Sequence, residues 1–136
     1  MIGLLLCWSG VVPKLRLPRT WEPKFIEYSM VPVYLSRISP IEIGAISLCG
    51  LVFSRGGIDE NTRRHEAIHF QQQLELLFVA FFILYFVFWL GGMLIHRFDG
   101  EKAYYNNPFE KEAFKNDTDP EYLKTTRKRF AWVHYI

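Results

Sequence analysis

A single long helix is the strongest secondary-structure prediction for this sequence. From Glu60 to Leu90 the chain contains neither proline nor glycine, and Asp59 stands just before it, where its carboxylate can cap free backbone N–H groups. Gly91 and Gly92 follow the segment and mark its end. We therefore predict one helix over residues 59–90.

The second half of this predicted helix is apolar on every face. Residues 74–95 carry one charged side chain, Glu75, and about 20 apolar residues are enough to span a bilayer. A helix without a polar face is not typical of the surface of a soluble protein, and Trp89 suits an anchor at a membrane interface. We expect residues 74–95 to be a membrane-embedded, transmembrane-type helix or to be covered by a hydrophobic protein partner, so the protein is expected to be membrane-associated.

The rest of the pattern predicts shorter elements around this helix. The expected fold class is α+β, mostly helical, in one domain over residues 1–136. The β part comes from a run of β-branched and apolar residues before the helix, with bends at Gly44 and Gly50. The expected elements are an irregular proline-rich segment at 1–40 with one short helix near Lys24–Tyr28, a strand or hairpin at 41–53, the helix at 59–90, a polar loop at 96–107, a short helix opened by Pro108 at 108–116, and a C-terminal helix at 119–130.

The residues that carry chemistry lie near the start of the long helix. His65 and His69 are four positions apart, so on a helix both imidazoles lie on one face and can bind the same metal ion. Glu66 is one step further round, where it can hold a water molecule rather than bind the metal. A zinc ion lowers the pKa of bound water to about 7 and polarises a carbonyl group, and a carboxylate then takes the proton. The pattern predicts a Zn²⁺ site with His65 and His69 as ligands and Glu66 as the catalytic base.

A catalytic zinc ion usually has three protein ligands, and the third is commonly a glutamate from a later helix. The candidates are Glu110 and Glu112 in the predicted helix 108–116, and they lie on different faces of it. Glu112 precedes the small residue Ala113, which leaves room for a close approach to the metal helix. We favour Glu112 over Glu110, which can equally be part of a solvated charged face.

Two short motifs resemble the zinc-binding helix and the glutamate helix of gluzincin-type metallopeptidases: DENTRRHEAIH at 59–69 and NPFEKEAFKN at 107–116. Most of the chain also resembles a family of small, uncharacterised bacterial membrane-associated proteins with a HEAIH-type motif and a downstream FEREA-type segment. The resemblance implies His65, His69 and Glu112 as ligands and Glu66 as general base. It also implies a polypeptide substrate.

One departure from the peptidase pattern concerns the residue that orients a metal-bound histidine. Where many gluzincins have an aspartate, this chain has Phe114, and Asn116 and Asp117 are the candidates to replace it. This departure bears on catalysis more than on metal binding. A peptidase also needs a group that stabilises the oxyanion. The candidates for that role are Tyr104, Tyr105 and His134.

The predicted membrane helix and the predicted metal site conflict in space. Twenty-two helical residues cover about 33 Å, so a helix that crosses a bilayer would place His69 and Glu112 on opposite sides. Either the helix dips into the membrane and the chain returns alongside it, or a partner chain covers the apolar surface, or Glu112 is not a ligand.

Charge and composition argue against one class of function, nucleic-acid binding. Sixteen Lys and Arg residues balance fourteen Asp and Glu residues, with no clustered basic face, so nucleic-acid binding is not expected. The leading hypothesis is a membrane-associated zinc metallopeptidase or related hydrolase. The alternatives are a non-catalytic small subunit of a larger assembly that uses zinc as a staple, and a membrane-binding protein without a metal.

Overall fold

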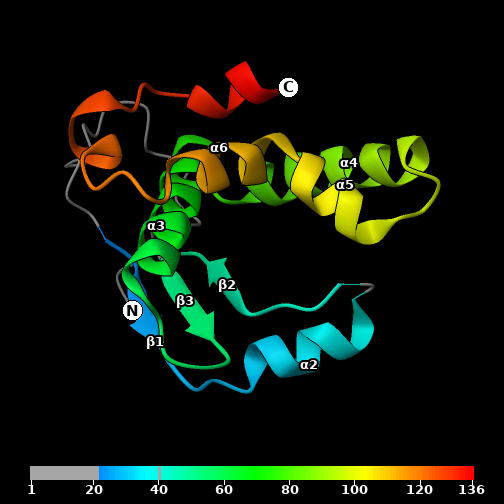
Figure 1. Cartoon of the computed structure of the whole chain (residues 1–136), viewed down its shortest axis with the longest axis horizontal. Helices are drawn as coiled ribbons and strands as arrows, with labels where there is room; N and C mark the ends of the chain where they lie inside the picture. The colour runs from blue at the N-terminus through cyan, green and yellow to red at the C-terminus, as the bar shows by residue number, and fades with distance from the viewer. Residues whose placement is uncertain (1–21, 40) are drawn as a thin grey trace.

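The computed structural model describes residues 22–39 and 41–136, in which a small sheet is joined to a larger helical part (Figure 1). The sheet has the strand order β1–β3–β2. Strand β3 (Leu51–Ser54) pairs parallel with β1 (Lys24–Ile26) and antiparallel with β2 (Ala45–Leu48). The mostly helical α+β class expected from the sequence is confirmed.

Strands β2 and β3 form a hairpin with a two-residue turn at Cys49 and Gly50. Both residues have positive φ, 48° and 86°, as the favoured two-residue hairpin turn requires. A Cβ atom added to Gly50 would lie 3.2 Å from the ring of Phe70, so the turn sits directly against the following helix. The hairpin predicted within 41–53 and its bend at Gly50 are confirmed.

The N-terminal prediction lies partly outside the described residues. Within them, the short helix expected near Lys24–Tyr28 is wrong, because Lys24 to Ile26 form β1. A helix, α2 (Val31–Ile38), begins a few residues later with Pro32 in its first turn, where a proline is tolerated.

The long helix predicted over 59–90 is wrong as one element. It consists of α3 (Glu60–Glu75), capped by Asp59, and α4 (Val79–Ile95), and the two are bent by 113°. The bend occurs at Leu77 and Phe78, whose φ angles are 53° and 58°. Sharp bends usually occur at proline or glycine, and neither is present here.

Packing accounts for the direction of this bend. Phe78 is 8% exposed and its ring centroid lies 6.4 Å from that of Phe70, so the bend places Phe78 inside the molecule. In the described ranges, no single helix is both long and apolar enough to cross a membrane; α3 and α4 satisfy that test only when they are taken together across the bend.

After α4 the chain turns back along it. Helix α5 (Gly100–Asn106) occupies most of the segment expected to be a polar loop, so that expectation is wrong. The two helices approach closely because Gly92 has no side chain: a Cβ there would lie 3.0 Å from the Cα of Ala103. The polar residues of this segment are therefore carried back along the apolar helix.

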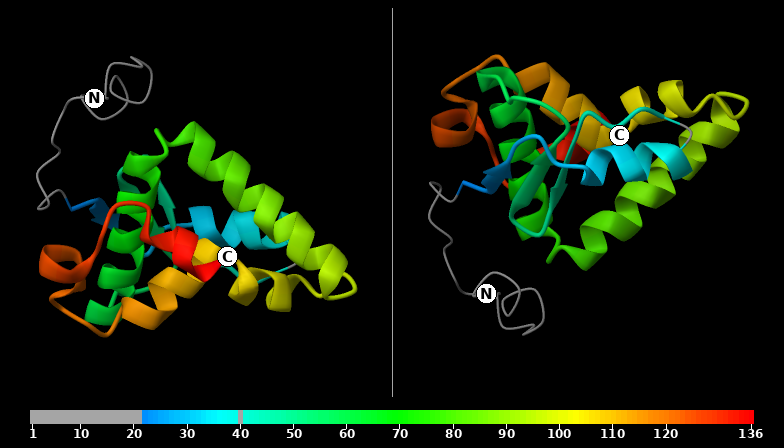
Figure 2. Two further views of the ribbon diagram at one scale, coloured as in Figure 1. Left: turned by 90° about the horizontal axis from the view of Figure 1, so that it is seen from above. Right: turned by 90° about the horizontal axis from the view of Figure 1, so that it is seen from below.

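Helix α6 (Pro108–Asn116) has the bounds predicted from the sequence, with Asn107 as its N-cap. It runs back to α3, where Ile68 packs against Ala113 and Tyr122 in one core cluster. In Figure 2, α3, α4 and the α5–α6 pair form three sides of a triangle, with the hairpin seen between them.

The C-terminal helix predicted over 119–130 is also wrong. A single π-helical turn, η1 (Tyr122–Thr126), is closed by a hydrogen bond from Arg127 N to Tyr122 O at 2.7 Å. A 3₁₀ helix, η2 (Ala131–Tyr135), then packs back, and Trp132 joins Phe109 and Phe81 in a second core cluster. The backbone is extended at Arg127, directly after this turn, and the Arg127 guanidinium is engaged in buried ion pairs.

Candidate metal centre

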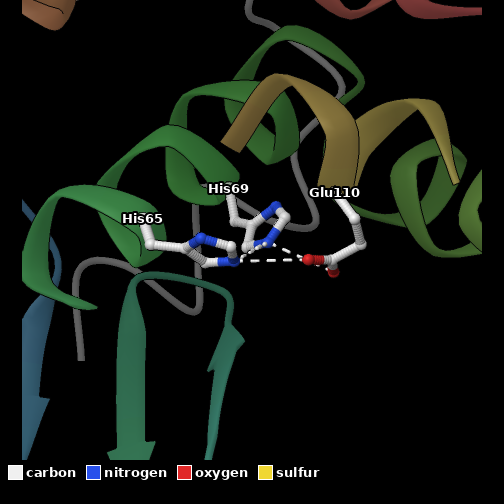
Figure 3. A group of neighbouring side chains, drawn as sticks. All are labelled: His65, His69 and Glu110. Atoms are coloured by element: carbon white, nitrogen blue, oxygen red, sulfur yellow. Dashed lines mark hydrogen bonds and ion pairs between the residues drawn. The ribbon is translucent and has the colours of Figure 1, made fainter. Parts of the chain in front are cut away.

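Three buried side chains from two helices meet at one point. His65 and His69 extend from α3, and Glu110 reaches them from α6 (Figure 3). The two Nε2 atoms are 3.1 Å apart. One carboxylate oxygen of Glu110 lies 3.2 Å from Nε2 of His65, and the other lies 3.3 Å from Nε2 of His69. This group could hold a metal ion.

The spacing of these atoms fits a small tetrahedral ion. Ligand atoms at about 2.0–2.1 Å from a tetrahedral zinc ion lie roughly 3.3 Å from one another. The two imidazole nitrogens, 3.1 Å apart, are close to that value, and each has a different oxygen of Glu110 at 3.2 or 3.3 Å. Two imidazole nitrogens and one carboxylate oxygen are also donors that zinc accepts.

Each member of the cluster is held by a further hydrogen bond. Nδ1 of His69 lies 2.8 Å from Oε1 of Gln72, and Nδ1 of His65 lies 3.4 Å from Oδ2 of Asp117. Both partners are acceptors, so each Nδ1 carries a proton and Nε2 is the nitrogen that can bind a metal ion. The hydroxyl of Tyr85, on α4, donates to Oε1 of Glu110 at 2.7 Å. The bend between α3 and α4 thus brings a residue of the apolar helix into the site.

The electrostatics of the cluster favour a cation between its members. Burial would lower the pKa of His69, but the charge and hydrogen bond of Glu110 raise it to about 9. Burial would likewise raise the pKa of Glu110, and the two imidazoles lower it instead. A metal ion that enters the cluster must therefore displace a proton.

Glu66 is the buried carboxylate without a complete set of partners. It is 6% exposed, and its Oε2 atom has no hydrogen-bond partner among the described residues. Burial raises its pKa, although the neighbouring histidines oppose the shift. An unsatisfied buried carboxylate oxygen costs about 1–3 kcal/mol or more, and Glu66 is among the residues that line the same cavity as the cluster.

That cavity has a volume of about 930 Å³. Its polar end is formed by the three cluster residues and Glu66. Another side is formed by the hairpin and by the segment that connects α2 to it. The wall formed by α4 is aromatic. The α4 residues that line it are Phe81, Phe82, Tyr85, Phe86 and Trp89.

The preference for Glu112 as third ligand is corrected, because Glu110 and not Glu112 lies with the histidines. Glu112 is fully buried and faces another network. Its Oε1 accepts hydrogen bonds from Arg127 Nε at 2.6 Å and from Tyr122 OH at 3.1 Å. The two glutamates do lie on different faces of α6, as expected, but the face that meets α3 at the cluster carries Glu110.

The remaining candidates divide between the site and its surroundings. Asp117 takes the place expected for an orienting aspartate, whereas the amide of Asn116 bonds Glu112 O and Tyr135 OH. Of the oxyanion candidates, Tyr104 lines the cavity, and Tyr105 and His134 are exposed and do not line it.

Sequence reasoning missed two residues of the site, Gln72 and Tyr85. Gln72 lies three positions after His69, on the same face of the helix, and that spacing was a usable signal. Tyr85 is the one hydroxyl-bearing residue in the apolar stretch 76–95. Trp89, expected to be an interfacial anchor, donates from its indole nitrogen to Gly100 O at 3.3 Å and lines the cavity.

Comparison of the chain with protein-family models, with curated proteins and with solved structures gave no match.

Proposed function

We propose that this chain is a zinc-dependent hydrolase of the metallopeptidase type, with His65, His69 and Glu110 as metal ligands and Glu66 as the base. The observation that carries the proposal is the unpaired Oε2 atom of Glu66, buried next to the cluster at the wall of a large cavity. A purely structural site would gain stability by pairing that oxygen, whereas a general base keeps a carboxylate oxygen unpaired for the proton that it takes.

Each residue of the site has a separate role in the proposed reaction. A zinc ion held by the cluster would supply Lewis acidity toward water and a carbonyl group. Glu66 Oε2 accepts a proton from the attacking water and then donates it to the leaving group. Tyr85 keeps Glu110 oriented, and Tyr104, which also lines the cavity and whose pKa is raised by burial and by the nearby Glu110, is the tyrosine proposed to serve the oxyanion.

An extended polypeptide is the substrate that best fits the hairpin. Strand β2 is at the edge of the sheet, and Ala45, Ile46 and Ser47 line the cavity. Ala45 and Ser47 pair with Ser54 and Val52 at positions that, by the alternation of the ladder, direct their own backbone groups away from β3. The Ser47 carbonyl accepts from Gln73, so a peptide would use the Ser47 N–H and the backbone groups of Ala45. A peptide that adds to this edge would run past Glu66.

Membrane association is proposed from the outer face of α4. Five of its apolar residues are 44–64% exposed on one side: Val79, Ile83, Val87, Leu90 and Leu94. Lipid contact along this face requires no crossing of the bilayer, which fits a helix that turns back through α5. Sedimentation with anionic phospholipid vesicles tests it. The proposal fails if the protein stays in the supernatant.

A non-catalytic zinc staple is the competing proposal. Structural zinc sites are closed by four protein ligands. The three-ligand cluster at the wall of a cavity of about 930 Å³ favours the hydrolase.

A Glu66→Gln variant tests the proposed chemistry. Because glutamine keeps the volume but cannot take a proton, the variant should keep one zinc ion per chain and lose at least about 100-fold in cleavage of fluorescent-labelled casein. Glu60→Gln, on the exposed first turn of the same helix, is the matched control and should retain full activity. Loss of zinc in Glu66→Gln, or unchanged cleavage, would refute the role of Glu66. A wild-type protein that binds zinc and cleaves nothing would favour the staple.

A further inference from the structure

Two adjacent glutamines on α3, Gln72 and Gln73, are both fully buried. Buried amides require hydrogen-bond partners, and the two residues find theirs in different parts of the molecule. Gln73 donates to Ser47 O at 2.9 Å and accepts from Cys49 N at 3.1 Å, so it fastens the hairpin to the helix. Gln72 makes no such contact with the sheet and is bonded to the metal centre instead.

The hydrogen bonds of Gln72 fix the orientation of its amide. Its Nε2 donates to Glu112 Oε2 at 2.9 Å and to Phe109 O at 3.1 Å. Both of these partners are acceptors without a proton to give, so a flipped amide would place its oxygen against two oxygens. Oε1 must therefore face His69, 2.8 Å from Nδ1.

A fixed amide oxygen in turn fixes the imidazole. Facing an acceptor, Nδ1 of His69 carries a proton, so Nε2 is the nitrogen that can bind a metal ion in the cluster. We propose that Gln72 is a positioning residue of the metal centre, which sets the tautomer and ring orientation of His69 for metal binding. This inference rests on the proposed zinc site and adds a residue that acts on it through His69.

The anchor behind Gln72 is a buried network of three charges. Arg127 donates to Glu112 from Nε and to Glu75 from Nη1, each at 2.6 Å, and the three side chains are at most 8% exposed. Removing one partner from such a network leaves a buried charge uncompensated, so the ion pair with Arg127 holds Glu112 in place as an acceptor. Glu112 thereby supports the metal centre two hydrogen bonds away from it, without being a ligand.

The expected size of the effect follows from other metal sites. Loss of the group that orients a metal-bound histidine typically reduces metal affinity 10–100-fold. Gln72→Met keeps the length and much of the volume of the side chain and removes both hydrogen-bonding functions. Gln73→Met makes the same chemical change at the adjacent buried position and serves as the matched control.

The test is zinc affinity of the whole chain, measured by competition with a chelating dye. Gln72→Met should bind zinc about 10–100-fold more weakly than wild type, while Gln73→Met should retain wild-type affinity even if it unfolds at a lower temperature. Proton NMR of the zinc-loaded protein adds a readout that a loss of stability does not change. The Nδ1–H resonance of His69 should be shielded from exchange in wild type and in Gln73→Met, and should be lost in Gln72→Met.

Glu112→Gln provides a second test if Gln72→Met fails to fold. Its amide cannot accept from both Arg127 and Gln72 as a carboxylate does, so zinc affinity should fall although the residue lies outside the cluster. Wild-type affinity in Gln72→Met or in Glu112→Gln, or equal losses in the two glutamine variants, would overturn the role of Gln72. A wild-type protein that fails to bind zinc would instead overturn the proposed function.

Discussion

Helices α3 and α4 adjoin in the sequence and distribute polarity in opposite ways. Of the eight buried residues of α3, five are polar or charged. In α4, which has no charged residue, Phe81 alone is buried. Large apolar side chains of α4 are exposed instead, among them Val79, Ile83 and Leu94 at 59–64%. The usual arrangement of a protein in water, polar outside and apolar inside, is inverted across the bend.

The buried polar residues of α3 and the exposed apolar residues of α4 have different physical explanations. The polar interior of α3 is satisfied within the chain, because its histidines and glutamines bond named partners and Glu66 faces the cavity. The apolar exterior of α4 has no such partner among the described residues. Contiguous exposed apolar surface of this kind marks a site of interaction with protein or membrane. One helix therefore carries the proposed chemistry, and the other carries the proposed contact with the surroundings.

The bend is what allows one chain to combine these two roles. A straight continuation would carry α4 away from α6, whereas the 113° turn brings Tyr85 within 2.7 Å of Glu110. Consecutive positive φ angles at Leu77 and Phe78 cost about 1–2 kcal/mol each. Burial of Phe78 and Phe81 offsets that cost.

The largest effect is expected when the third proposed metal ligand, Glu110, is removed. Glu110→Ala removes the carboxylate from the cluster and leaves two histidines, so zinc binding should weaken by more than the roughly 100-fold that loss of an orienting partner causes. Elemental analysis of the protein after gel filtration measures the zinc retained. Glu101→Ala, an exposed site on α5, is the control. Stoichiometric zinc in Glu110→Ala would contradict the ligand set.

A smaller effect, on stability, separates the two faces of α4. Phe81 is 4% exposed and Ile83 is 59% exposed. Truncation of a buried phenylalanine costs about 3–5 kcal/mol, while exposed positions usually change stability by less than about 0.5 kcal/mol. Urea unfolding in the presence of chelator should therefore show a large loss for Phe81→Ala and almost none for Ile83→Ala. An equal loss for Ile83→Ala would mean that the outer face is covered within the protein itself.

The same contrast explains what could be predicted from the sequence. The metal motif of α3, the hairpin and the bounds of α6 follow from local signals: histidine spacing, a glycine in a two-residue turn, and proline after asparagine. The bend could not be predicted, because Leu77 and Phe78 are ordinary helix residues. The direction of the bend is set by packing with residues distant in the sequence.

The choice between Glu110 and Glu112 illustrates the limit within the site. Helix α6 was predicted with correct bounds, but which of its faces meets the histidines depends on its rotation. That rotation is set by Ala113 against Ile68 and by Arg127, fifteen residues after Glu112, which pairs with it. Nothing local to α6 reports these contacts, so the ligand followed from tertiary structure alone.

The smallest effect is expected at His65, whose partner Asp117 is more exposed than Gln72, the partner of His69. Asp117 lies 3.4 Å from Nδ1 of His65, and its side chain is 17% exposed, whereas Gln72 is fully buried and 2.8 Å from His69. Asp117→Asn keeps an oxygen that can accept from Nδ1 and removes only the charge, so zinc affinity should fall by no more than about tenfold, the low end of the range for such partners. The dye competition used for the glutamine variants measures it, with Asp119→Asn as an exposed control. A greater loss of zinc affinity in Asp117→Asn than in Gln72→Met would contradict this order. The long, partly exposed contact of Asp117 with His65 would then matter more for zinc binding than the buried contact of Gln72 with His69.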